Sequence, residues 1–357
     1  MIRLPFTLLA VAAVMMLTSC PGPNRPPATT PFAFITPDGL PPPTLPADNP
    51  LTVEGLLLGR QLFFDPILSG DSTQSCSSCH NPEFAFTDNG KQFSEGIDGS
   101  IGDRNSMAVF NMAWHKGFFW DSRAATLREQ ALGPITNPIE MKADMSEVLI
   151  RLNESERYSD MFWKAFGVTD ISEDELALAL EQFMLSIVSG KAKFDQVVAG
   201  NATFTDSEQR GLVIFNGEAD PNSPNGGADC FHCHGNALFT NHEFLNNGLD
   251  TVLTDLGLGG HTGLAHDEGK FKVPSLRNLA YTAPYMHDGR FSSLTEVIEF
   301  YDSGVQPDSP NISTLMVDFL NGGLNLSFQD KLDLIAFLNT LNDPYIESDT
   351  LYQNPFE

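Results

Sequence analysis

Two copies of one five-residue motif, Cys-X-X-Cys-His, constrain this 357-residue chain more than any other feature. The first motif runs from Cys76 to His80 and the second from Cys230 to His234. In this motif two thiols add to the vinyl groups of a haem, and the histidine that follows is placed to ligate the iron. The sequence therefore predicts two covalently bound haems of the c type, one at each motif.

The cysteine count supports this interpretation. The chain has five cysteines, and four of them, Cys76, Cys79, Cys230 and Cys233, belong to the two motifs. A disulfide across two intervening residues is strained and redox-active, and it gives no reason for a histidine after each pair. A zinc ribbon places its cysteine pairs about 15 to 20 residues apart, and these pairs are far more distant. Disulfides and zinc are the alternatives to haem.

The N-terminus resembles a bacterial lipoprotein signal. Arg3 precedes an apolar run that is too short to span a bilayer as a mature helix, and small residues then lead to Cys20. We expect residues 1–20 to be a signal peptide and Cys20 to carry the lipid; the alternative is an ordinary secretory signal with an incidental cysteine. Residues 21–50 are rich in proline and predict a semi-rigid tether. The expected location is the periplasm, with a lipid anchor in a bacterial membrane, the outer membrane being favoured.

Composition bounds the fold and the partners. With 41% hydrophobic residues the chain can bury a sizeable core, and its length allows two domains. The formal net charge is -26, which argues against a nucleic-acid-binding surface and favours basic partners or simple solubility. No membrane contact is expected other than the lipid anchor.

Helix signals dominate the rest of the chain. Capping boxes, in which a serine or threonine is followed three residues later by glutamate, predict helix starts at Ser172, Thr205 and Ser293. A last helix begins near Phe328, and its predicted apolar stripe consists of Leu332, Ile335, Leu338 and Leu341. We therefore expect an all-α fold with two cytochrome c-like haem domains, followed by a short tail. Their ranges are residues 51–200, 201–345 and 346–357.

Several stretches around the two motifs resemble the bacterial di-haem cytochrome c peroxidase and MauG family. They read "LGRQLFFDPILSGDSTQSCSSCHNPEFAFTD", "GDRNSMAVFNMA", "FFWDSRAATLREQALGPITNPIEM" and "FKVPSLRNLAYTAPYMHDGRF", in the family's order and over nearly all of residues 53–343. The resemblance implies that the chain reduces hydrogen peroxide, or uses it to oxidise a partner protein. It also implies a peroxidatic haem in the N-terminal domain and an electron-relay haem in the C-terminal domain.

Three residues match the family's catalytic positions. Glu140, in "NPIEM", matches its distal acid-base glutamate, and Gln130, in "LREQAL", matches its distal amide. Such residues suit the chemistry, because a peroxidatic iron needs a group that moves a proton between the peroxide oxygens and a polar neighbour that orients them. Trp120, in "FFWDSR", matches the tryptophan between the haems. The alternatives are a solvated loop carboxylate, an exposed helix residue and a core tryptophan.

The loop before "RNS" departs from the better-known peroxidases, which carry there a histidine that caps the resting peroxidatic haem. Here it reads "SEGIDGSIGDRNS", without histidine, and Ile97 aligns with the capping position. The first iron, held by His80, is therefore expected to be five-coordinate and ready for peroxide without prior reduction.

The second iron is expected to be held by His234 and a second protein ligand. Peroxidases of the family have a methionine fourteen residues after the histidine that matches His287, whereas here that count reaches Tyr301. MauG-like proteins carry tyrosine at this position, and an anionic oxygen ligand stabilises higher iron oxidation states. Tyr301 is thus the expected ligand and Met286 is the competing one. The third possibility is that Tyr301 is an ordinary helix residue that does not bind the iron.

The family also binds calcium between its domains, and the matching positions are Asn105, Thr282 and Pro284. Oxygen ligation suits that cation, but this expectation rests on the resemblance alone.

The remaining histidines are less informative. His232 is a spacer inside the second motif, and His287 is expected to have a structural or relay role. Surface or loop positions are predicted for the others, which have no partner at metal-ligand spacing: His115, His242, His261 and His266.

Three functions remain open at this point. The first is a peroxidase that takes electrons from a small redox protein such as cytochrome c, through the C-terminal haem to the N-terminal haem. The second is a MauG-like oxidase that modifies tryptophan or tyrosine of a partner protein. The third is a non-catalytic di-haem electron-transfer protein, which the match at Glu140 and Gln130 disfavours.

Overall fold

The computed structural model describes residues 27–88, 90–219, 226–320 and 323–357. The predicted signal peptide, with Cys20, lies outside these ranges. Helices predominate in the described part of the chain, together with one small sheet. None of the described helices combines the length and the apolar character that crossing a membrane requires.

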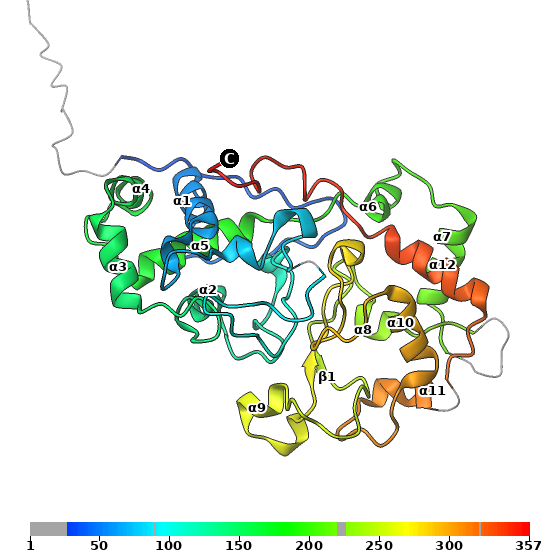
Figure 1. Cartoon of the computed structure of the whole chain (residues 1–357). Helices are drawn as coiled ribbons and strands as arrows, with labels where there is room; N and C mark the ends of the chain where they lie inside the picture. Colours follow the sequence, from blue (N-terminus) through cyan, green and yellow to red (C-terminus); the bar gives the residue numbers. More distant parts are fainter. Residues whose placement is uncertain (1–26, 89, 220–225, 321–322) are drawn as a thin grey trace, which may run out of the picture.

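The elements fall into two halves, which lie side by side in Figure 1. The helices of the first half are α1 (Val53–Phe64), α2 (Leu127–Thr136), α3 (Met145–Glu154), α4 (Glu156–Phe166) and α5 (Glu173–Ser186). Those of the second half are α6 (Lys193–Val198), α7 (Asp206–Phe215), α8 (Phe231–His234), α9 (Leu258–Thr262), α10 (Leu294–Glu299), α11 (Val317–Leu320) and α12 (Phe328–Asn339). Strands β1 (Phe244–Leu245) and β2 (Phe271–Lys272) pair antiparallel, with Leu245 opposite Phe271.

Each half is built on a close crossing of its long helices. In the first half α1 crosses α5 at Gly59, where an added Cβ atom would lie 1.9 Å from the carbonyl oxygen of Ala179. In the second half α7 crosses α12 at Gly211, where an added Cβ would lie 1.9 Å from the carbonyl oxygen of Asp333. Any side chain at either glycine would force the two backbones apart, so the crossings require glycine.

The aromatic cores repeat this arrangement. Four residues after each glycine a phenylalanine meets a phenylalanine of the crossing helix: Phe63 lies 5.2 Å from Phe183, and Phe215 lies 5.2 Å from Phe337, between ring centroids. The repeat is therefore one of architecture, because the sequences of the two halves differ around these positions.

The predicted helix starts are confirmed. Helices α5, α7 and α10 begin directly after Ser172, Thr205 and Ser293, and each of these residues forms a capping box with the glutamate three residues later. The reciprocal hydrogen bonds satisfy backbone N–H groups that the first turn of a helix leaves without partners.

The predicted stripe of α12 is wrong at Leu332, and Leu341 lies beyond the end of the helix at Asn339. Leu338 and Leu341 are buried, but the side of the helix that carries Leu332 faces solvent, and Leu332 is 43% exposed. The helix buries Leu334 and Phe337 instead, because the crossing with α7 turns that side inward.

The proline-rich segment is not a free spacer over its described part, which corrects the prediction for residues 27–50. Leu40 is buried against the first half, and the indole N–H of Trp114 donates to the carbonyl of Pro41 at 2.6 Å. The side chain of Asn49 donates to Glu181 of α5 at 2.8 Å. The segment therefore belongs to the folded body.

The C-terminal residues also pack on the first half, as the red segment of Figure 1 shows. The buried Tyr352 donates its hydroxyl to the carbonyl of Ser186 at 2.8 Å, and Arg60 of α1 donates to the carbonyl of Gln353. Helix α6, which the predicted boundary assigns to the first domain, packs Phe194 into the second core. Both segments connect the two halves.

We predict that Gly59→Ala and Gly211→Ala each destabilise the protein by about 1–3 kcal/mol, the usual cost of overpacking. Thermal unfolding of the haem-loaded protein measures the effect. Gly260→Ala is the control, because its Cβ would meet only the side chain of Leu256 at 3.6 Å; its effect is expected within about 0.5 kcal/mol. Equal midpoints for all three variants would contradict the crossing argument.

Candidate functional site

Each Cys-X-X-Cys-His motif lies on a short helical turn, and its histidine is oriented by a backbone carbonyl. The Nδ1 atom of His80 lies 3.0 Å from the carbonyl oxygen of Phe86, and that of His234 lies 2.9 Å from the carbonyl oxygen of Phe239. When Nδ1 donates in these hydrogen bonds, Nε2 keeps the lone pair that binds a metal. Burial lowers the pKa of both histidines, that of His234 to about 4, so both rings are neutral as ligation requires.

The four motif cysteines are free thiols in the structure. Burial raises the pKa of Cys76 and Cys230 to about 12 and that of Cys79 and Cys233 to about 11. Neither pair is joined by a disulfide in the structure, which agrees with haem attachment rather than with the disulfide alternative. The thiols and histidines instead line two cavities, as haem attachment requires.

The first cavity contains the first motif together with Glu140 and Gln130. The Oε1 atom of Gln130 is buried and has no hydrogen-bond partner among the described residues. Glu140 accepts a hydrogen bond of 2.7 Å from the side chain of Asn137. Burial raises the pKa of Glu140, while Arg123 and Asn137 oppose the rise. The fold thus brings an unpaired acceptor and a carboxyl suited to proton transfer to the cavity of His80.

The loop before "RNS" lies directly against the segment of Glu140. The backbone N–H of Ile97 donates to the carbonyl of Glu140 at 3.0 Å, and a Cβ at Gly96 would lie 2.3 Å from the carbonyl oxygen of Ile139. Ile97 itself is not among the residues that line the first cavity. The histidines that line it, within the described ranges, are His80 and His115.

Trp120 lines both cavities. Its indole N–H donates to the carbonyl of Asn105 at 2.9 Å, and its own carbonyl accepts from the backbone N–H of Lys272 at 2.8 Å. The first of these bonds lies within the first half of the chain and the second joins the halves. The indole therefore lies where the two cavities meet, which is the position that a relay would need.

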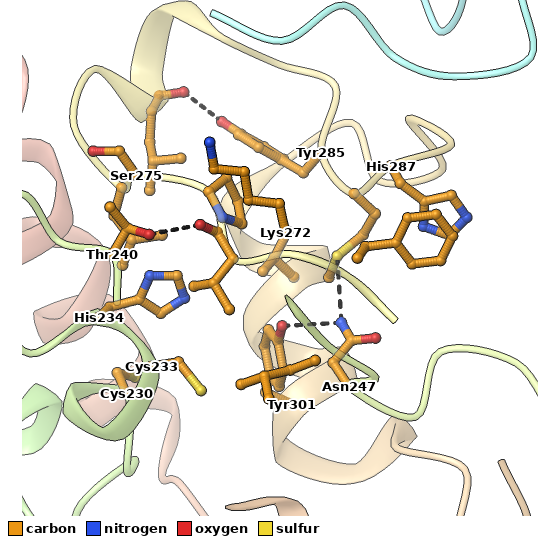
Figure 2. A pocket seen from close by; sticks show the side chains of 18 of the residues that line it. Cys230, Cys233, His234, Thr240, Asn247, Lys272, Ser275, Tyr285, His287 and Tyr301 are labelled. Carbon is orange, nitrogen blue, oxygen red and sulfur yellow. Dashed lines mark hydrogen bonds between the residues drawn. The ribbon is translucent and has the colours of Figure 1, made fainter. Parts of the chain in front are cut away.

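The second cavity contains the second motif, Tyr301 and Met286. Figure 2 shows the His234 ring and the Tyr301 hydroxyl pointing into it from different sides. Tyr301 lies on the π-helical turn η7 (Phe300–Gly304), which follows α10. Burial raises the pKa of Tyr301 to about 12, so its hydroxyl ionises at neutral pH only when a cation lies beside it.

Asn247, which the sequence reasoning missed, contacts both candidate ligands of the second cavity. Its side-chain N–H₂ donates to the hydroxyl oxygen of Tyr301 at 3.1 Å and lies 3.8 Å from the sulfur of Met286. A hydrogen bond to the phenol oxygen lowers the pKa of Tyr301 against the effect of burial. No motif marks Asn247, because it lies in a loop far from both partners in sequence.

The predicted calcium residues Asn105, Thr282 and Pro284 all line the second cavity. The side chain of Asn105 donates to the carbonyls of Lys91 and Gln92 at 3.2 Å each. Calcium binding stays a prediction. His287 also lines this cavity and stacks on Phe271 with 3.7 Å between ring centroids.

His115 and His242 lie in loops, as predicted, but both are partly buried and they form a pair that was not predicted. Their rings lie 5.2 Å apart, and the Nδ1 atom of His115 lies 3.0 Å from the Nζ atom of Lys272. The pairing depends on tertiary contacts, so sequence spacing could not reveal it. His261 and His266 are exposed, as predicted, and so is the spacer His232.

We predict that the purified protein retains two haems after acid-acetone extraction, as measured by intact mass. Replacing both Cys230 and Cys233 by alanine should remove one of the two haem additions, because thioether bonds then cannot form at the second motif. His232→Ala, which changes the exposed spacer, should keep both. A parent protein with one haem or none would contradict the reading of the motifs.

Comparison with known proteins agrees with this site. A family described as di-haem cytochrome c peroxidase matches residues 53–203. The chain is 36% identical to the methylamine utilization protein MauG of Methylophilus methylotrophus over 94% of each chain. It is 33% identical to the cytochrome-c peroxidase IdrP1 of Pseudomonas sp. strain SCT over 87% of each chain.

One solved structure has the same architecture over nearly the whole described chain. It is that of a MauG-like protein associated with microbial copper homeostasis, with a TM-score of 0.82, 34% identity, and coverage of 91% of this chain and 100% of that one. The curated relatives and this structure confirm the resemblance seen in the motifs. The chain belongs to the di-haem cytochrome c peroxidase and MauG family, which implies covalently bound haem c.

Proposed function

We propose that this protein is a di-haem peroxidase that reduces hydrogen peroxide in the first cavity, with electrons that enter through the second. One observation carries the proposal: His80, Glu140 and Gln130 line the same cavity, and two of its polar groups are suited to peroxide. The Gln130 acceptor is buried without a partner, and the pKa of Glu140 is raised by burial. A non-catalytic electron carrier needs neither feature.

The proposed role of Glu140 is to move a proton between the two peroxide oxygens, while the haem iron supplies the redox chemistry. A carboxyl with a raised pKa can both accept a proton and return it near neutral pH. The hydrogen bond from Asn137 fixes the orientation of the carboxyl, and Arg123 opposes the rise of its pKa. Gln130 would accept a hydrogen bond from the peroxide and so orient it.

The proposed electron route runs from the second haem to the first by way of Trp120. The indole lines both cavities, and its backbone is bonded to β2 of the second half. The acidic surface, with a formal net charge of -26, would attract a small basic redox protein such as a cytochrome c to the molecule. The proposal has three further parts. Each half of the chain is a cytochrome c-like domain, and calcium binds at Asn105. The protein is exported and carries a lipid on Cys20.

A second candidate function is a MauG-like oxidation of tryptophan or tyrosine in a partner protein. The observation that favours it is Tyr301, whose hydroxyl shares the second cavity with His234 and is held by Asn247. An anionic oxygen ligand stabilises oxidised iron more than a thioether does. Two oxidising equivalents could then be held across both haems until a protein substrate consumes them.

We predict that Glu140→Gln slows the reaction with peroxide by about 10²-fold or more, the usual range for losing a positioned acid-base group. Stopped-flow absorbance of the haems measures the rate. Both haems should still be incorporated. Glu83→Gln, which changes an exposed carboxylate, serves as the control and should react at the parent rate. If Glu140→Gln also reacts at that rate, Glu140 is a bystander.

The pH dependence gives a second test of Glu140. Accepting a proton from peroxide requires the ionised carboxylate, so the parent rate should rise with pH through the pKa of this group. Because burial raises that pKa, the rise should lie above the ordinary glutamate range. Glu140→Gln should lack this step, and its persistence in the variant would assign it to another group.

We predict that the diferric protein reacts with peroxide without a reductant, because the loop before "RNS" offers no histidine cap and Tyr301 stabilises oxidised iron. Spectra recorded with and without ascorbate test this. Tyr301→His should keep the second haem but lose the reaction of the diferric state, whereas Met286→Leu should change neither. A methionine-to-iron charge-transfer band in magnetic circular dichroism would assign Met286 as ligand and would place the protein with the reductively activated peroxidases.

A further inference from the structure

A lysine is buried between the two cavities without an acidic partner. Lys272 of β2 is 2% exposed and lines both cavities. Its Nζ atom donates to the carbonyl of Gly117 at 2.8 Å and lies 3.0 Å from Nδ1 of His115. No ion pair of Lys272 is found within the described ranges, and burial lowers its pKa to about 8.

Two histidines add to this basic cluster, which consists of Lys272, His115 and His242. The ring of His242 lies 5.2 Å from that of His115, and both of its nitrogens are buried with no hydrogen-bond partner among the described residues. The charged groups that act on these histidines are both lysines, Lys272 and the exposed Lys116. Both histidine pKa values are lowered, first by burial and then by these cations.

Such a cluster is unfavourable in isolation. Burying a cation costs several kcal/mol unless an anion or several hydrogen bonds compensate, and a buried imidazole with two unpaired nitrogens adds its own desolvation cost. Among the described residues no acidic side chain pairs with Lys272, so an anionic group bound between the cavities would offset this cost.

We infer that Lys272, His115 and His242 bind the carboxylate side chains of the two haems, and that Lys272 is shared between them. The inference rests on the presence of two haems and not on the identity of the electron donor or protein substrate.

The attachment chemistry supports this assignment. The cysteines of each motif bind the edge of a haem that carries the vinyl groups, and the two carboxylate side chains extend from the opposite edge. Figure 2 shows Cys230 and Cys233 on one side of the His234 ring and Lys272 on the other. Lys272 and His115 line both cavities, whereas His242 lines only the second. A carboxylate from either haem could thus reach Lys272, and His242 would serve the second haem.

Sharing one cation gives the haems an electrostatic link. A cation near a haem stabilises the ferrous state over the ferric state, so it raises the reduction potential. The backbone N–H of Lys272 donates to the carbonyl of Trp120, so the residue that carries the shared charge is held next to the proposed relay. The cluster residues are positioning residues, since they act on the haems and not on peroxide.

The test compares Lys272→Met with Lys272→Arg in the haem-loaded protein. Spectroelectrochemical titration gives the potential of each haem, and resonance Raman gives the bending vibrations of the haem carboxylates. Lys272→Met should lower the reduction potential of both haems by about 59 mV. This shift corresponds to a ferric-to-ferrous ratio on the order of tenfold higher at a fixed electrode potential. Lys272→Met should also shift the carboxylate vibrations, and Lys272→Arg should retain most of both signals.

Lys270→Met is the matched control, because Lys270 lies two residues away and is paired with Asp267 at 3.1 Å. It should leave the potentials and the vibrations unchanged. Equal results for Lys272→Met and Lys270→Met would overturn the inference.

His242→Phe keeps the inference testable if Lys272→Met does not fold. This variant should alter the carboxylate vibrations and potential of the second haem alone, and an effect confined to the first haem would contradict the assignment. Glu140→Gln separates the two proposals, because it should slow the peroxide reaction while leaving the carboxylate vibrations of both haems and the potential of the second haem at their parent values.

Discussion

The close crossings at Gly59 and Gly211 are the constraint on which the rest of the structure depends. Each brings two helix backbones into contact and aligns the phenylalanines that form the core beside one motif. Both helix pairs therefore have the same arrangement. The two halves differ in the segments that lie between the crossing helices in the sequence. The first half inserts α2 and the loop of Glu140, and the second inserts β2, α10 and the turn that carries Tyr301.

These insertions give the two cavities opposite chemical characters. The first contains, beside His80, an amide oxygen of Gln130 with no hydrogen-bond partner among the described residues and the carboxyl of Glu140, whose pKa is raised by burial. The second places a phenol and an amide opposite His234. Under the proposed function, peroxide would react in the first cavity and Tyr301 would ligate the iron in the second, and Trp120 lies where the two cavities meet.

Much of this could be predicted from the sequence, because the signals concerned are local. The motif of His80 and the capping box of Ser172 each span only a few consecutive residues, so the local sequence is enough to identify them. Tertiary contacts decide the features that were missed. Leu332 faces solvent because of the way α12 meets α7, and Lys272 approaches His115 from more than a hundred and fifty residues away. Spacing rules cannot detect a pair that only the complete fold assembles.

The packing of residues 27–50 on the first half has a consequence for how far the enzyme can reach. The first residue of this segment that bonds to the folded body is Thr30, so a lipid on Cys20 would leave residues 21–29 between them, at most about 30 Å of fully extended chain. The body would then remain within roughly one domain diameter of the lipid surface. Redox partners would have to meet it in the thin layer next to the membrane, and the orientation of the body would decide which cavity they reach first.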